Sequence, residues 1–156
     1  MAEVNLALNS SCHLANLSSS EMEVRLTQLA LIMVFGAFGT LSRYSLGIFS
    51  SRFFGDHFPF GTLIINVTGC LVFGFIMQLS AATEFIPRGF RVAATVGFLG
   101  AFTTFSTFGF ETYQLIRDGA MGRALVNGTA NLLTGLFAVW LGVVLAGYLA
   151  SFPPSR

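Results

Sequence analysis

Four long apolar segments divide the sequence, and each one is long enough to cross a membrane. They cover residues 26–50, 60–82, 88–117 and 122–150. A helix needs about 20 apolar residues to cross the hydrocarbon core of a bilayer. Backbone in hydrocarbon must also make its hydrogen bonds internally, which an α-helix achieves within a single segment. The sequence therefore predicts an all-α integral membrane protein with four transmembrane helices.

The small number of charged residues agrees with a membrane protein and excludes several other classes. Only 10% of the residues are charged and none is a lysine, whereas a soluble domain carries about 25%. A net charge of +1 without a basic cluster leaves no footprint for nucleic acid. The spans hold no histidine and one acid, Glu111. An enzyme would need paired catalytic or metal-binding groups, and the spans contain none, so we do not expect an enzyme. Cys12 and Cys70 lie in unlike surroundings, and we predict no disulfide between them.

The two ends of the chain are polar and lie outside the spans. Residues 1–24 lack the basic and apolar regions of a signal peptide, so we expect a mobile N-terminal tail. Ser20 and Glu23 have the spacing of a capping box, which predicts that the first helix begins near them. Residues 25–151 then form the transmembrane domain, and residues 152–156 form a C-terminal tail.

The arginines give almost no orientation signal. With four spans, both termini lie on one side of the membrane, and the two sides carry four and three arginines: Arg25, Arg88, Arg91 and Arg156 against Arg52, Arg117 and Arg123, with Arg43 inside the first span. Positive charge normally sets topology. A chain without this bias can insert in both orientations, which predicts an antiparallel dual-topology homodimer with two-fold symmetry. The alternative is one weakly biased orientation.

The third span has the composition of an interrupted helix. Its segment at 97–108, GFLGAFTTFSTF, combines glycines with β-branched and hydroxyl side chains that compete for backbone hydrogen bonds. Broken helices at membrane depth use their freed carbonyl groups to coordinate ions. An alternative is that Ala93, Gly97 and Ala101 form a small-residue packing seam of an unbroken helix.

A few polar and aromatic side chains in the spans could line a path. Their spacing places three of them on one face of the second span: Thr62, Asn66 and Cys70. On the fourth span, a stripe at helical spacing consists of Asn127, Asn131 and Thr134. Phe105 and Phe108 are three residues apart and share a helix face. The edge of an aromatic ring is electropositive, so two rings presented edge-on can hold an anion. The alternative is that both rings face lipid or the protein core.

Four motifs together resemble the Fluc/CrcB family of bacterial fluoride channels. They are GAFGTLSRY at 36–44, GTLIIN at 61–66, GFLGAFTTFSTF at 97–108 and NGTANLLTG at 127–135. The resemblance extends over residues 26–150. It implies an antiparallel dual-topology homodimer in the bacterial inner membrane, with two pores through which fluoride leaves the cell passively.

The resemblance also implies roles for particular residues. The fluoride pathway would comprise Asn66, Phe105, Phe108, Ser106, Thr107, Thr62 and Asn131, with Arg43 and Glu111 close to it. The backbone carbonyls of Gly100 and Thr103 from both subunits would hold a structural Na⁺ at the dimer centre, as suits a hard cation.

The roles of Arg43 and Glu111 stay open, and Ala101 and Asn131 depart from the family pattern. Arg43 either concentrates anions in a vestibule or extends to the interface for packing, and Glu111 suits gating or helix packing better than direct binding of an anion. Ala101 stands where the family often has a second glycine. Asn131 stands where relatives can have a serine, and it still offers a donor.

A proton-coupled exporter of the small multidrug type is the alternative function. Such an exporter is also a small four-helix protein of dual topology, and its mechanism needs an acid in the first span. No acid lies between Thr27 and Phe49. We therefore expect the fluoride channel.

Overall fold

The computed structural model describes residues 19–55, 57–84 and 86–151, and in these residues all regular structure is helical. The first, second and fourth spans are single helices, α2 (Ser19–Phe54), α3 (Phe60–Ala82) and α7 (Met121–Ala150). All four predicted spans are confirmed as helical segments long and apolar enough to cross a membrane. Helix α2 begins next to Ser20, close to the predicted start. The rest of the predicted N-terminal tail and the predicted C-terminal tail lie outside the described residues.

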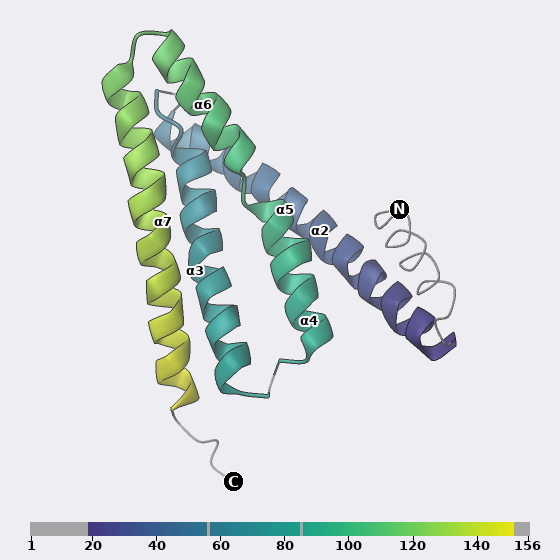
Figure 1. The fold of residues 1–156 in the computed structure, drawn as a ribbon. Helices are drawn as coiled ribbons and strands as arrows, with labels where there is room; N and C mark the ends of the chain where they lie inside the picture. The colour runs from purple at the N-terminus through teal and green to yellow at the C-terminus, as the bar shows by residue number, and fades with distance from the viewer. Residues whose placement is uncertain (1–18, 56, 85, 152–156) are drawn as a thin grey trace, which may run out of the picture.

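The third span is built from four pieces. Helix α4 (Arg88–Val92) continues into a π-helical segment, η1 (Ala93–Leu99), and then into α5 (Gly100–Phe102). Thr103 and Thr104 follow with extended backbone, at ψ angles of 157° and 109°, before α6 (Phe105–Arg117) begins. Helix α6 leaves this point in a new direction and meets α7 at the far end (Figure 1). The predicted break in the third span is therefore confirmed.

The predicted small-residue seam is present as well, in the first half of the same span. Gly97 packs on the backbone of Ile32 in α2, and Gly39 of α2 packs on the carbonyl group of Phe98. Ala93 is fully buried. The two interpretations of the third span thus apply to different parts of it: η1 and α5 pack against α2, with close contacts at Gly97, and the helix opens after Phe102.

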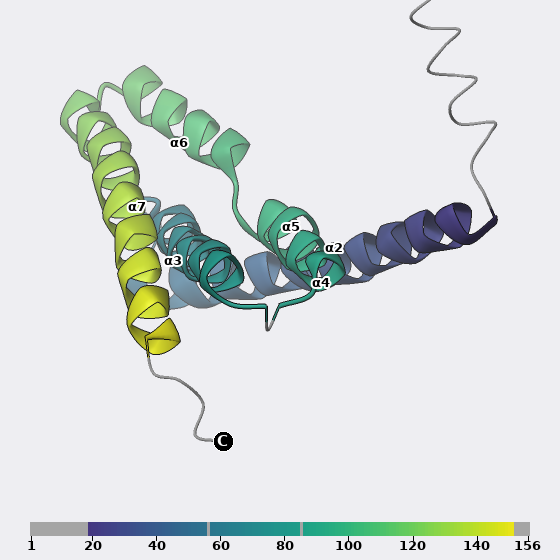
Figure 2. The same cartoon turned by 60° about the horizontal axis from the view of Figure 1, so that its bottom comes forward.

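Helices α3 and α7 lie side by side along their length (Figures 1 and 2). Their backbones approach closely because glycines stand at the contacts. A methyl group on Gly74 would overlap the carbonyl oxygen of Val139, and a methyl group on Gly142 would overlap that of Leu71. Close approach through small residues is how helices associate in membranes, where apolar burial drives little. This pair is the frame that holds the polar residues of both helices in register.

The glycines at this contact should not tolerate a larger side chain. Gly142→Ala should lower the free energy of unfolding by about 1–3 kcal/mol, the usual cost of overpacking. Gly147→Ala on the same helix is the matched control, because no atom beyond the neighbouring backbone of α7 lies within 4 Å of the added methyl group, and alanine favours the helix. Thermal unfolding in detergent should show a lower midpoint for the first variant only. Equal midpoints for the two variants would contradict the close packing.

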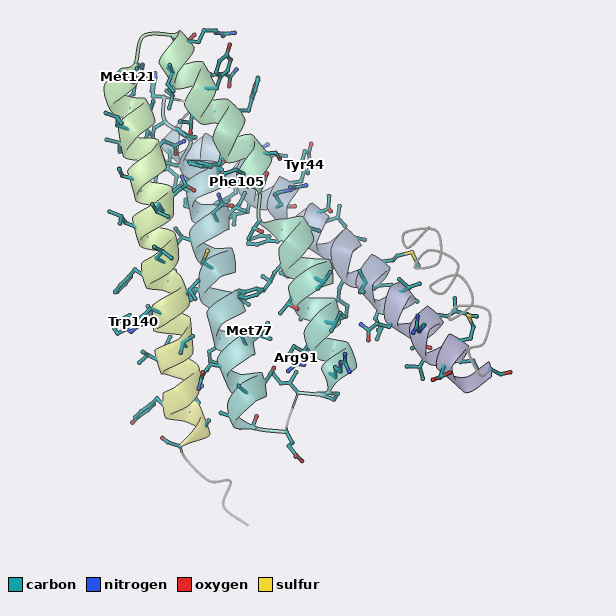
Figure 3. The ribbon with its side chains drawn as sticks, viewed as in Figure 1. Tyr44, Met77, Arg91, Phe105, Met121 and Trp140 are labelled. Carbon is teal, nitrogen blue, oxygen red and sulfur yellow. The ribbon has the colours of Figure 1, made fainter. Side chains whose placement is uncertain are left out.

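The outer parts of the fold are little buried in a single chain. The residues of α2 from Glu21 to Thr27 are all exposed, and the start of this helix projects away from α3 and α7 (Figure 2). Trp140 points outward from α7 (Figure 3) and its side chain is 57% exposed. Helix α6 has no buried residue at all.

Candidate functional site

The side chain of Asn66 in α3 clamps the break in the third span. Its Oδ1 accepts a hydrogen bond from the backbone N–H of Thr104 at 3.0 Å, and its Nδ2 donates to the carbonyl oxygen of the same residue at 3.3 Å. The same Nδ2 donates to Oδ1 of Asn131 in α7 at 3.0 Å. Extended backbone inside a bundle leaves peptide groups that need partners. Asn66 supplies both of them for the Thr104 residue.

This clamp diverts the donors that would continue the helix. In an unbroken α-helix, the N–H of Thr104 would bond the carbonyl of Gly100, and the N–H of Thr107 would bond that of Thr103. Instead, Asn66 takes the first donor, and the Thr104 hydroxyl takes the second at 3.2 Å. The carbonyl groups of Gly100 and Thr103 have thus lost their helical donors. They are the two carbonyls that the family resemblance assigns to a sodium ion.

A cluster of hydroxyl groups surrounds the start of α6. Thr104 caps the helix, and its hydroxyl donates to Oγ1 of Thr107 at 2.9 Å. The Thr104 hydroxyl can then only accept from Oγ of Ser106, at 3.4 Å. The side chain of Thr104 is buried, whereas Ser106 and Thr107 are exposed in the single chain. The exposed Thr107 hydroxyl keeps its own proton for a ligand or a neighbouring molecule, whereas the Ser106 hydroxyl offers its proton only when it releases Thr104.

A cavity of about 790 Å³ lies between α2, α3 and α6. Its lining includes four predicted site residues and the capping residue of α6: Arg43, Thr62, Thr107, Glu111 and Thr104. The hydroxyl of Thr62 donates to Oε1 of Glu111 at 2.9 Å, and the other carboxyl oxygen is buried without a partner among the described residues. Within the described part of the chain, Arg43 and Glu111 share this cavity without forming a salt bridge. The cavity therefore presents a cationic and an acidic side chain together.

A smaller cavity lies on the other side of the clamp. It has a volume of about 240 Å³, and its lining includes Asn66, Gly100 and Thr103. Gly100 is exposed in the single chain, and Thr103 is half-buried. The two residues predicted to hold sodium thus share one open hollow next to the clamp.

Phe105 and Phe108 are neighbours on α6, as the spacing predicts. Their ring centroids are 5.5 Å apart and the rings are inclined by 55°. Phe105 lies directly after the break (Figure 3), and its side chain is 82% exposed, whereas Phe108 is half-buried. A ring so exposed within a single chain is open to whatever lies beside the break, whether lipid, water or a second protein molecule.

The predicted residues thus form three groups that meet at the break. Arg43, Thr62, Thr107 and Glu111 line the large cavity, Asn66 and Asn131 form an amide pair, and the remaining three lie at the start of α6: Phe105, Ser106 and Phe108. Sequence reasoning missed the capping and lining role of Thr104, although it follows Thr103 directly. It also missed the contact between Asn127 and Thr112, which joins two different helices and has no signal in spacing.

The fold and the site define a helical membrane protein with four spans and a polar, hydroxyl-rich break in the third. The family model described as CrcB-like protein, Camphor Resistance (CrcB), matches residues 30–143. The chain belongs to this family.

Curated relatives match the chain over nearly their whole length. One from Geobacter metallireducens is 45% identical over 121 residues, which are 78% of this chain and 98% of the relative. Others from Citrifermentans bemidjiense and Dehalococcoides mccartyi are 44% and 41% identical, over 76% and 78% of this chain and 96% and 94% of the relatives. Each of the three is named "Fluoride-specific ion channel FluC".

Proposed function

We propose that this chain is a fluoride-selective channel, and not an enzyme, that lets fluoride leave the bacterial cytoplasm passively across the inner membrane. The observation that carries the proposal is the break at Thr103–Thr104, with hydroxyl groups and two phenyl rings at one place in a membrane span. The names of the relatives, at 41–45% identity, support the same function.

Fluoride is small and strongly hydrated, so the path must replace its water with donors and electropositive edges. The exposed hydroxyls of Ser106 and Thr107 are donors of this kind, and the edges of Phe105 and Phe108 attract an anion without neutralising it. Attraction at each site stays weak, as conduction requires that an ion can leave.

The two polar amides have different roles in this account. Both N–H groups of the Asn66 amide have protein acceptors, so this residue donates to fluoride only when it releases one of them. Asn131 accepts one of these bonds and donates to Asn127. Asn66 can therefore exchange its hydrogen bond to Asn131 for one to fluoride. Both amides therefore belong to the pathway as donors that must first break a hydrogen bond within the protein before they can bind fluoride.

The large cavity would be the mouth of the path. Arg43 lines it without an ion-pair partner among the described residues, so its charge can raise the local concentration of anions. Glu111 repels anions when ionised and accepts a hydrogen bond from Thr62, which suits a role in gating or in holding α6 to α3.

We further propose that two chains form an antiparallel dual-topology homodimer around a structural Na⁺. The near-equal arginine count on the two sides supports dual topology, and the exposed Phe105 ring is open to a second protein molecule. The carbonyls of Gly100 and Thr103, which lack their helical donors, would hold the ion from each subunit. Oxygen ligands suit a hard cation of this kind.

A proton-coupled exporter is the competing function, and fluoride efflux decides between the two. Proteoliposomes that contain potassium fluoride and the purified protein should release fluoride, measured with a fluoride electrode, when valinomycin lets potassium follow. A channel should release fluoride at the same initial rate with and without an imposed pH gradient, when both rates are measured without a proton ionophore. Release that requires a proton gradient would favour the exporter and contradict the proposal.

A further inference from the structure

Asn127 in α7 is a fully buried polar side chain with 0% exposure, and the proposed pathway makes no use of it. Its Nδ2 donates to the hydroxyl of Thr112 in α6 at 2.9 Å, and its Oδ1 accepts from Nδ2 of Asn131 at 3.0 Å. A buried amide without partners is costly. Asn127 is satisfied only by groups that themselves belong to the region around the break.

The bond to Thr112 leads directly to the backbone of a pathway residue. The Thr112 hydroxyl donates to the carbonyl oxygen of Phe108 at 2.7 Å. A chain of donors therefore runs in one direction from Asn66 through Asn131, Asn127 and Thr112 to Phe108. Turning any one amide over would set two acceptors or two donors against each other, so the chain fixes the orientation of all its members.

The position of helix α6 depends on this series of hydrogen bonds, because α6 makes few other side-chain hydrogen bonds to the rest of the protein. None of its residues is fully buried, and its apolar side chains are at most half-buried in the single chain, as at Phe108 and Leu115. Its described side-chain hydrogen bonds to other helices are Thr62 to Glu111, which reaches α3, and Asn127 to Thr112, which reaches α7. Only the second involves a residue that also bonds the backbone at Phe108.

We propose that Asn127 is a positioning residue for the fluoride path. By holding Thr112, the Asn127 side chain fixes α6 against α7 and sets the place of the Phe108 ring. It shares the orientation of Asn131 with its own backbone carbonyl, which accepts from the same Nδ2 at 3.1 Å. The proposal rests on the proposed function only in taking the ring of Phe108 as part of the path. Asn127 itself touches no ion in this account.

Paired variants and two readouts test the proposal. Fluoride efflux is measured on Asn127→Ala, on Thr112→Val and on the double variant, with Thr112→Ser as the conservative variant that keeps the hydroxyl. The same proteins carry 4-fluorophenylalanine at position 108 only, and ¹⁹F spectroscopy reports on the ring. Thr129→Val is the matched control on α7, because the Thr129 hydroxyl bonds only carbonyls of its own helix, at 2.8 and 3.3 Å.

Both single variants should lose at least about tenfold in initial efflux rate, as expected when a buried donor or its acceptor is removed. The double variant should lose no more than either one, because both remove the same contact. The resonance of residue 108 should shift or broaden in all three. Thr112→Ser and Thr129→Val should keep the efflux rate within about twofold and leave the resonance in place.

Three outcomes would overturn the proposal: Asn127→Ala with normal efflux and an unchanged resonance, losses that multiply in the double variant, or a Thr112→Ser that fails as badly as Thr112→Val. Should Asn127→Ala fail to fold, the valine and serine variants at Thr112 still decide. Should the unsubstituted protein carry no fluoride, the proposed function fails, while the resonance at position 108 continues to test the positioning role.

Discussion

We expect that replacing Phe105 or Phe108 with isoleucine will lower fluoride efflux at least about tenfold, which corresponds to about 1.4 kcal/mol added to the barrier. Isoleucine keeps an apolar side chain of comparable bulk and removes the electropositive ring edge. The two rings lie together, with centroids 5.5 Å apart at the start of α6, so each contributes to the same stretch of the path. Efflux from proteoliposomes measures the effect, and size-exclusion chromatography establishes that the oligomer of the unsubstituted protein is retained.

A phenylalanine elsewhere provides the control for this experiment. Phe137 in α7 also belongs to a ring pair, with Trp140 at a centroid distance of 5.5 Å, and is 59% exposed. Phe137→Ile should therefore remove an exposed ring without touching the break, and efflux should persist. Normal efflux in both Phe105→Ile and Phe108→Ile would remove the rings from the mechanism.

Asn66→Asp should abolish fluoride efflux. The amide nitrogen of Asn66 donates to the carbonyl oxygen of Thr104 and to Oδ1 of Asn131. A carboxylate at this place would set an acceptor against both oxygens, and it would add a negative charge to an anion path. Like charges and unpaired acceptors in a buried site are each costly, so the two effects act in the same direction. The measurement is again initial efflux, with the oligomer assayed in parallel.

The same chemical change near the end of α3 gives the control. Gln78→Glu also converts an amide to a carboxylate, but Gln78 lies twelve residues further along the helix, outside the linings of both cavities. Efflux should remain close to that of the unsubstituted protein. An Asn66→Asp variant that conducts as well as Gln78→Glu would contradict the assignment of Asn66 to the path.

The spans could be predicted from the sequence because apolar length alone decides what can cross a membrane. The interruption of the third span could also be predicted, since glycines and adjacent threonines weaken the helix locally. Its exact position could not, because Asn66 determines it from 38 residues away in the chain. The tertiary hydrogen bond from the N–H of Thr104 to Asn66 decides at which residue of this weakened stretch the helix is interrupted.

The π-helical segment Ala93–Leu99 had no signal in the sequence. Such segments differ from an α-helix by one residue in the hydrogen-bonding interval, and the local composition suits either form. The contacts of Glu111 with Thr62 and of Asn127 with Thr112 were equally out of reach. Each joins side chains of two different helices, and spacing along one helix carries no information on its rotation against another.

The broken third span should provide a route for fluoride and not for larger halides. The measurement that tests it most directly compares fluoride and chloride efflux from the same preparation of proteoliposomes, with potassium release through valinomycin in both cases. The account predicts rapid fluoride release and chloride release at the level of protein-free vesicles. Chloride release comparable with that of fluoride would contradict it.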